Sequence, residues 1–203
     1  MLILKIMKLF FKFFSLFRTS FYNIIFKTNF KKIGNNVSLD ISGNVVFGKG
    51  VTIESGVTIV VEKGALLEIG NNVFIGESVY IKCYGGQIKI GHDVSINSKS
   101  FLNGAGGLSI GSNTRIGTQS IMISSNHIFE NETALIKDQG TSREGISIGE
   151  DVWFGARVTV LDGVNITNRV VVGACSLVNK TITESGVVVG IPAKIIKELN
   201  IEK

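Results

Sequence analysis

The feature that most restricts the fold is a six-residue period that begins at Ile33 and continues almost to the end of the chain. An aliphatic residue recurs at every sixth position, usually followed by a small or polar residue. Insertions of two or three residues shift the phase near 45–50, 61–66 and 83–89, and the period then returns. The clearest repeats begin at Ile69, Ile90, Ile110 and Ile148, and the phase runs on through Val160, Ile166, Val172 and Val178.

A period of six fits neither an α-helix nor a single alternating strand. It fits three short strands per turn of a prism, with the aliphatic residue and the fifth residue of each hexad pointing inward. Glycine, Asn and Asp fall at the corners, where left-handed backbone angles are needed. At about 18 residues per coil, residues 33–194 predict an all-β solenoid of about eight coils with one non-repeating stretch.

Residues 1–32 form a different, basic and apolar segment. They hold seven of the 21 cations of the chain and none of its 16 acidic residues, so the remainder of the chain is nearly neutral. Eight of the 13 phenylalanines lie between positions 1 and 30. Lys5, Lys8, Lys12, Ser15 and Thr19 are spaced by three or four, so they predict one polar stripe on an amphipathic helix.

Two placements of this helix stay open. It lies in an anionic membrane surface, making a peripheral contact through residues 1–30, or it packs on the end of the body or at a subunit contact. A spanning helix is not expected, because the longest uncharged run has eight residues. No signal peptide is visible. Nucleic acid is not an expected partner, because the aromatics are typical of buried anchors.

The histidines differ in their surroundings. His92 falls at a corner of an ordinary hexad and is expected to be structural. His127 follows Asn126 and directly precedes a polar excursion over about 129–145, where the six-residue phase is lost. Excursions of this length from a regular coil are usually functional or disordered. We therefore expect His127 to lie at a site that the loop walls off.

Residues 151–156 (Asp-Val-Trp-Phe-Gly-Ala), 161–164, 172–176 and 190–197 (Gly-Ile-Pro-Ala-Lys-Ile-Ile-Lys) carry a resemblance to a known family. Together with the hexads they resemble the hexapeptide-repeat acyltransferases, in the sugar, lipopolysaccharide and capsule O-acetyltransferase branch that includes galactoside acetyltransferases. The resemblance covers about 160 residues. It implies a left-handed parallel β-helix over 33–194, a homotrimer, acetyl-CoA as co-substrate and no metal. After the last coil we expect a short helix in a tail over 195–203.

The resemblance also implies a cofactor groove between neighbouring subunits. Backbone groups at the small residues would contact the pantetheine arm, and the lysines would supply charge near the phosphates. Trp153, the only tryptophan, is expected on an outward corner, where it would line this groove. The expected cofactor-binding residues are Trp153, Gly155, Ala156, Ala174, Asn179, Lys180, Lys194 and Lys197.

His127 is the expected general base in a direct transfer from the thioester to a hydroxyl. Backbone N–H groups would stabilise the tetrahedral oxyanion. A route through Cys83 or Cys175 is not expected, because neither has a histidine nearby in sequence to activate it. The group that orients His127 stays open among a backbone carbonyl and four acidic residues. These are Glu130, Glu132, Asp138 and Glu144.

The expected function is acetylation of a sugar hydroxyl in a cell-surface polysaccharide, lipopolysaccharide or precursor. Asn97, Asn103 and Asn126 are candidate acceptor-binding residues, although each could equally be a structural corner asparagine. The alternatives are N-acetylation of a nucleotide-linked amino sugar and a non-catalytic scaffold. A zinc-dependent carbonic anhydrase on the same fold would need three histidines, and the chain has two.

The cysteine content bears on the compartment. Two cysteines suit a reducing environment, so we expect a cytoplasmic protein. A membrane contact through residues 1–30 would hold it on the inner face of the plasma membrane.

Overall fold

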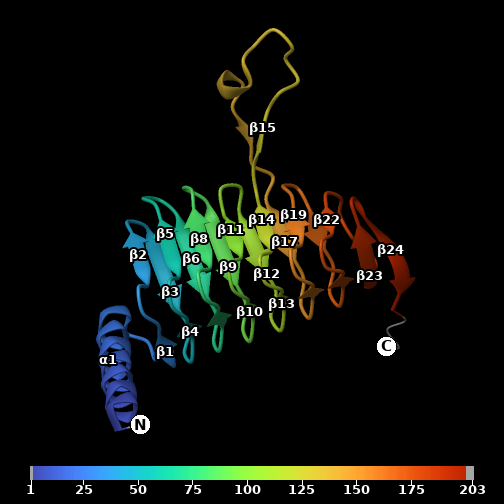
Figure 1. Ribbon diagram of the computed structural model, residues 1–203. Coiled ribbons are helices and arrows are strands. Elements are labelled where there is room, and N and C mark those ends of the chain that lie inside the picture. The colour runs from blue at the N-terminus through green and yellow to red at the C-terminus, as the bar shows by residue number, and fades with distance from the viewer. Residues whose placement is uncertain (1, 200–203) are drawn as a thin grey trace.

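The computed structural model describes the backbone of residues 2–199 and the side chains of residues 13–199. Its body is a parallel β-helix, in which the chain passes from sheet A to sheet B to sheet C in each turn. Figure 1 shows the turns stacked between a helix at one end and a hairpin at the other. The predicted all-β repeat architecture is confirmed.

The three long sheets have the following strands. Sheet A contains β1 (Lys32–Ile33), β4 (Thr52–Ile53), β7 (Phe74–Ile75), β10 (Ser95–Ile96), β13 (Arg115–Ile116), β18 (Trp153–Phe154), β21 (Val171–Val172), β23 (Gly186–Gly190) and β24 (Ala193–Glu198). Sheet B contains β2 (Ser38–Ile41), β5 (Thr58–Val61), β8 (Tyr80–Cys83), β11 (Phe101–Asn103), β14 (Ile121–Ile123), β19 (Thr159–Val160) and β22 (Leu177–Val178). Sheet C contains β3 (Asn44–Phe47), β6 (Leu66–Ile69), β9 (Gln87–Ile90), β12 (Leu108–Ile110), β17 (Ile146–Ile148) and β20 (Asn165–Ile166).

The body makes about seven turns, one fewer than expected from the sequence. A late turn, from Trp153 to its sheet A partner Val171, has the length of three hexads. An early turn, from Thr52 to its partner Phe74, is longer than this. Early turns are longer because extra residues, such as 62–65, loop out at the corner between sheets B and C.

The hexad aliphatics form in-register columns inside the prism. On sheet A one column is almost completely buried, because inward residues of successive turns pair directly above one another. Burying each such side chain contributes about 1.5–3 kcal/mol. The column consists of Ile33, Ile53, Ile75, Ile96, Ile116, Phe154, Val172 and Val188.

The corners have the expected backbone geometry. Asn72, Asp93 and Asn113 occupy successive corners between sheets C and A with φ of 57°, 56° and 64°. Such positive angles favour glycine, Asn and Asp. Cys175 also has a positive φ, of 60°, at a corner between sheets A and B.

The predicted N-terminal helix is present as α1 (Leu2–Phe26). Its C-terminal part packs on the first turn, where the rings of Phe26 and Phe47 lie 5.1 Å apart and those of Phe30 and Phe47 4.9 Å apart. The Nε of Arg18 donates to the Ile33 carbonyl, and the Ile33 N–H donates to the Thr19 hydroxyl. Among the described residues, no helix is both long and apolar enough to cross a membrane.

The prediction of a short C-terminal helix is wrong. The chain turns at Ile191 and Pro192, whose peptide bond is cis, and returns as β24, antiparallel to β23. Without β24, the strand β23 would end sheet A with a row of unpaired backbone N–H and C=O groups. Pairing with β24 satisfies these groups. The predicted tail therefore begins inside a strand, and residues 200–203 lie outside the described part.

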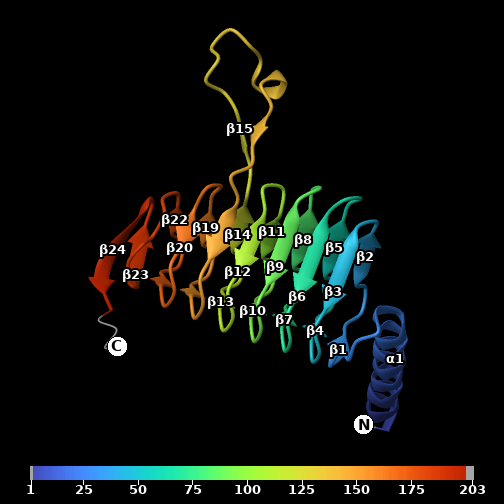
Figure 2. The same ribbon diagram turned by 180° about the vertical axis from the view of Figure 1, so that it is seen from behind.

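An excursion over residues 125–145, here called the arm, interrupts the β-helix after β14. It consists of β15 (Asn126–His127) and β16 (Thr141–Ser142), paired antiparallel, and the 3-10 turn η1 (Ile136–Asp138). The arm stands away from the body at the corner between sheets B and C (Figures 1 and 2). The loop expected over about 129–145 is present, but it begins four residues earlier and contains His127.

Candidate active site

His127 lies on the first limb of the arm, in register with Thr141. Its side chain is exposed, so the arm does not wall off a site around it within one chain. No hydrogen bond joins its ring to another residue of the described chain. The carboxylate of Glu130 instead accepts the Phe129 N–H at 3.1 Å. None of the four acidic candidates, Glu130, Glu132, Asp138 and Glu144, orients the imidazole in an isolated subunit.

The outgoing limb of the arm is fixed to the body by Ser124, which is buried. The Ser124 hydroxyl donates to the Asn103 carbonyl at 2.8 Å and accepts the Gly106 N–H at 3.1 Å. Gly106 is needed here, because a Cβ at this position would lie 2.3 Å from the Ser124 carbonyl oxygen and 2.9 Å from Arg143 Cα. Both limbs of the arm therefore pack directly against the backbone of Gly106, where any side chain would clash with them.

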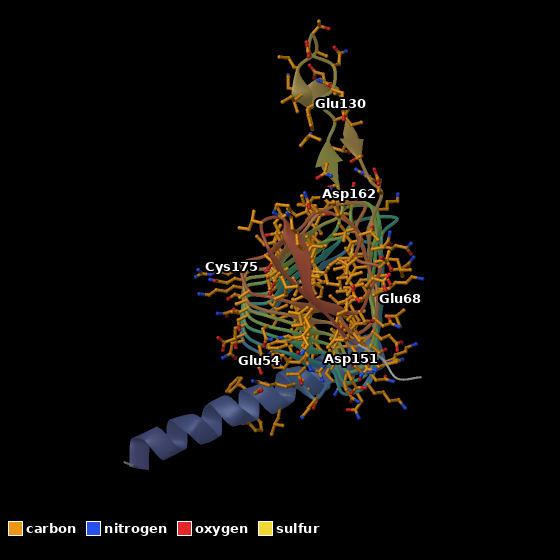
Figure 3. All side chains as sticks on the ribbon, turned by 90° about the vertical axis from the view of Figure 1, so that its right-hand side faces the viewer. Glu54, Glu68, Glu130, Asp151, Asp162 and Cys175 are labelled. Carbon is orange, nitrogen blue, oxygen red and sulfur yellow. The ribbon has the colours of Figure 1, made fainter. Side chains whose placement is uncertain are left out.

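Asp162 fixes the returning limb. Its carboxylate accepts the Gly145 N–H at 2.7 Å, the Glu144 N–H at 3.2 Å and the Ser142 hydroxyl at 3.1 Å. Figure 3 shows Asp162 directly beneath the arm. Because Ser142 is paired with Asn126, this carboxylate determines where the rung next to His127 lies. Asp162 was not singled out from the sequence as a site residue.

We expect Asp162→Ala to loosen the arm without unfolding the body. The change removes three hydrogen bonds to a carboxylate at a partly exposed site, which costs about 1–3 kcal/mol in all. Local opening at 142–145 should then become roughly 5- to 150-fold more frequent, which amide hydrogen exchange of that segment measures. Asp151→Asn is the control, because Asn tolerates the positive φ of 55° at this exposed corner and the change removes only a 3.8 Å ion pair with Arg169. Equal exchange at 142–145 in both variants would contradict this role for Asp162.

The small residues expected at the cofactor share one corner, between sheets A and B. Gly155 and Ala156 follow β18, and Ala174 lies one turn further on, with its side chain exposed. A Cβ on Gly155 would lie 2.6 Å from the Ala174 nitrogen, so these turns stack closely. Cys175, at the same corner, lies on a different edge of the prism from Asp162 (Figure 3).

The other expected cofactor residues lie elsewhere. Asn179 and Lys180 follow β22, at the corner that carries the arm, and both are exposed. Lys194 and Lys197 lie on β24, at the end of sheet A. Trp153 lies on the outer face of sheet A within β18 rather than at a corner, with 58% of its surface exposed. One chain therefore does not bring these groups to a single point.

The acceptor asparagines have separate surroundings. The Asn97 amide donates to the Ile116 carbonyl at 2.8 Å, which is a structural role at the corner between sheets A and B. Asn103 is buried and accepts the Ala105 N–H at 2.8 Å, so it shapes the base of the arm. Asn126 is exposed on the arm beside His127. Of the three, only Asn126 has an exposed side chain next to His127.

Two adjoining cavities lie at the base of the arm. One, of about 320 Å³, lies over sheet C, and its polar lining consists of Gln87, Lys89, Ser109, Glu144, Ser147 and Asn165. The second, of about 380 Å³, shares Gln87, Gly106 and Gly107 with the first and is also lined by Arg143. We call the two together the polar groove. Arg143 lies two residues from Thr141, the partner of His127, so the groove reaches the base of the limb that pairs with His127. Sequence reasoning missed it because its residues come from five turns.

The two cysteines differ, and neither forms a disulfide. Cys83 points into the core, and burial raises the pKa of its thiol to about 11, an effect that a backbone hydrogen bond to Ile88 partly offsets. It is therefore protonated at neutral pH. Cys175 is exposed at the corner between sheets A and B.

His92 has the structural role expected of it. Its Nδ1 accepts the Asn71 N–H at 2.9 Å, and its own N–H donates to the Ser112 hydroxyl at 3.0 Å. Among the residues that the structure describes, no cluster of three or more His, Cys, Asp or Glu side chains is placed to hold a metal ion.

Comparison with known proteins connects this geometry to a family. The family model described as bacterial transferase hexapeptide (six repeats) matches residues 145–180. A probable acetyltransferase of Mycobacterium tuberculosis is 32% identical over 155 residues, which are 76% of this chain and 50% of the relative. The putative lipopolysaccharide biosynthesis O-acetyl transferase WbbJ of Escherichia coli is 33% identical over 144 residues, 67% of this chain and 74% of the relative. The galactoside O-acetyltransferase of Escherichia coli is 31% identical over 132 residues, 65% of this chain and 64% of the relative.

Solved structures share the fold. The polySia specific acetyltransferase NeuO aligns with a TM-score of 0.67 and 22% identity over 84% of this chain and 74% of its own. The N-acyltransferase AntD of Bacillus cereus, solved as a mutant with dTDP-4-amino-4,6-dideoxyglucose and coenzyme A, aligns with a TM-score of 0.59 and 18% identity over 91% and 90%. At these identities the likeness establishes the fold alone. The chain spans half the length of its mycobacterial relative and about three quarters of WbbJ. From the repeats, the β-helix and the match to WbbJ, the chain belongs to the hexapeptide-repeat family of bacterial acyltransferases.

Proposed function

We propose that this protein transfers the acetyl group of acetyl-CoA to a hydroxyl of a sugar in a cell-surface polysaccharide, lipopolysaccharide or its precursor. The observation that carries the proposal is the position of His127, exposed on an arm whose base borders a polar groove. The groove offers hydroxyl, amide, carboxylate and ammonium groups, which suit the hydroxyls of a sugar. The names of the relatives agree with this chemistry.

His127 acts as general base. The thioester is an activated donor, whereas a sugar hydroxyl is a poor nucleophile until its proton is removed. A neutral imidazole within hydrogen-bond distance accepts that proton as the hydroxyl attacks the thioester carbon. The imidazolium then returns a proton to the leaving thiolate. We propose a direct transfer; Cys83 cannot serve as a nucleophile, because its thiol is buried in the core and protonated at neutral pH.

The corner between sheets A and B would receive acetyl-CoA. Gly155, Ala156 and Ala174 leave the backbone there uncovered, which suits the narrow pantetheine arm. Lys180 lies at the opposite edge of sheet B, and Lys194 and Lys197 lie on the terminal hairpin, so phosphate binding by all three needs more than one chain. The donor corner and the arm lie at different edges of one prism (Figure 3), so a complete site needs a second subunit.

We propose a homotrimer in which sheet B faces the threefold axis. Its outer row is apolar over three successive turns, at Tyr80, Phe101 and Ile121, with Tyr80 and Ile121 exposed by 38% and 36% and the rings of Tyr80 and Phe101 5.4 Å apart. Turning this face inward buries it and places the edges of sheet B against the two neighbours. The corner between sheets A and B of one subunit then meets the arm of the next. We also propose that the protein is cytoplasmic, because both cysteines are unpaired, as is usual in a reducing compartment.

The test is acceptor-dependent release of coenzyme A thiol by the full-length protein. The panel contains free sugars, capsule and lipopolysaccharide oligosaccharides and nucleotide-linked amino sugars. We expect a product that gains one acetyl group and loses it in mild alkali, as an ester does. An alkali-stable product formed only from the amino sugars would replace O-acetylation by N-acetylation. Absence of acceptor-dependent release across the panel, in protein shown to be folded, would favour a scaffold.

A further inference from the structure

The α1 helix carries an apolar stripe that nothing in the described chain covers. Thr19, Tyr22 and Phe26 face the body, where Thr19 is buried and the rings of Tyr22 and Phe26 pack against the core. The opposite face holds large apolar side chains exposed by half or more. They are Phe13 (66%), Phe17 (67%), Phe21 (53%), Ile24 (78%) and Ile25 (53%).

The stripe follows from the spacing of these residues. Phe13, Phe17 and Phe21 are four residues apart, and Ile24 follows at three, so they lie on one face of the helix. Burying such side chains within the chain would require a partner element, and the described residues supply none on that side. Five exposed apolar residues on one face are unusual for a protein surface and indicate an interaction site.

The position of the helix keeps this stripe accessible. The 25 residues of α1 extend about 37 Å, yet its contacts with the body come from the C-terminal part. Seen along the β-helix axis, α1 runs out beyond the outline of the prism, on the side away from the arm (Figure 3). A surface that receives the stripe therefore does not cover the arm or the polar groove.

The positive charge of residues 1–32 indicates which kind of surface the apolar stripe of α1 binds. Residues 1–32 carry seven cations and no acidic residue. The side chains of Lys5, Lys8 and Lys12 lie outside the described part, whereas Lys27 and Lys31 are exposed near the end of the helix. A second copy of α1 would bring the same positive charge and be repelled. An anionic bilayer attracts the cations and takes up the aromatic side chains at its interface.

We propose that α1 lies in the surface of an anionic membrane, with Phe13, Phe17 and Phe21 inserted at the boundary between headgroups and acyl chains. Among the described residues no helix is long and apolar enough to cross a bilayer, so we propose a peripheral attachment that depends on both apolar area and charge. In a cell this surface would be the inner face of the plasma membrane. An enzyme held there meets lipid-linked glycans at the membrane surface.

Flotation of the full-length protein with vesicles tests this proposal. We expect binding to vesicles of about 30% phosphatidylglycerol in phosphatidylcholine, and binding to phosphatidylcholine alone at least about 10-fold weaker. Raising NaCl from about 0.1 M to about 0.5 M should weaken the anionic binding, because the screening length shortens. The triple variant F13S/F17S/F21S should bind at least about 100-fold more weakly than the unmodified protein.

The matched control is I191S/I196S, which removes two exposed apolar side chains (74% and 64%) from the opposite end of the body. It should float like the unmodified protein. Circular dichroism and sedimentation of the variants show that fold and oligomeric state are kept. Equal flotation of the triple variant and the control would overturn the proposal. Loss of the native oligomer in F13S/F17S/F21S would overturn it too, because it would assign the stripe to a second copy. Both results are independent of acetyl transfer.

Discussion

Replacing His127 by glutamine should lower kcat about 10²- to 10⁴-fold, the range that a positioned general base contributes. Glutamine keeps the size and polarity of the side chain but does not accept a proton. Because the residue is exposed on the arm, the change should leave the fold and its thermal midpoint unchanged. The KM for acetyl-CoA should move by less than kcat, since the lost interaction belongs to the transition state.

The control for this variant is the other histidine in the chain. In His92→Asn, the new side-chain oxygen takes over the acceptor role of Nδ1 toward the Asn71 N–H. Asn71 and Asn168 already make the same kind of bond at comparable corners. Steady-state rates with acetyl-CoA and the best acceptor of the panel compare the two variants. If His127→Gln kept activity within a few-fold of His92→Asn, His127 would not be the base.

The body of the fold could be predicted because the residue types within each hexad indicate which positions are buried and which form a corner. An aliphatic residue at every sixth position must be inside a three-sided coil, and the column from Ile33 to Val188 shows that result. The corner residues carry an equally local signal, since Asn72, Asp93 and Asn113 adopt the positive φ that their residue types tolerate. The number of turns was overestimated because insertions at one corner make the early coils longer than 18 residues, although the six-residue period returns after each insertion.

The candidate site was less predictable because its contacts join distant segments. The Asp162 carboxylate binds residues of the preceding turn, and the sequence shows only one more acidic residue at a corner. The polar groove combines one or two outward residues from each of several strands, and each of these is an ordinary surface residue in isolation. His127 was identifiable from its neighbours, but its position inside the arm depends on the pairing of β15 with β16.

The C-terminal segment was mistaken for a helix for a related reason. Residues 193–198 (Ala-Lys-Ile-Ile-Lys-Glu) have composition and charge that suit a helix as well as a strand. The choice is made by β23, whose backbone needs a hydrogen-bonding partner at the end of the stack. Local propensity does not indicate the unpaired edge of β23, because that edge exists only after the turns of the β-helix have formed.

The division of the proposed site between two subunits has a direct consequence for mixed oligomers. His127 belongs to the arm, at the corner between sheets B and C, and Ala174 belongs to the corner between sheets A and B. Ala174→Trp should fill the donor groove, and because Ala174 is exposed the bulky ring meets solvent rather than the core. Alone, Ala174→Trp should raise the KM for acetyl-CoA strongly, and His127→Gln should lower kcat. Each pure variant should therefore be nearly inactive.

Mixed trimers of His127→Gln and Ala174→Trp should recover about a third of the unmodified activity. A working site needs its arm from the Ala174→Trp chain and its donor corner from the His127→Gln chain. Whichever variant supplies two chains, a closed ring of three has one such interface. The measurement is thiol release by trimers co-expressed with two different tags and purified through both, so that every trimer is mixed.

Doubly tagged trimers of His127→Gln alone give the background for this measurement. If doubly purified mixed trimers stayed at that background, the imidazole and the donor corner would have to meet within one chain. That arrangement would require the arm to fold back across sheet B, because the two groups lie at different edges of the prism in an isolated subunit (Figure 3).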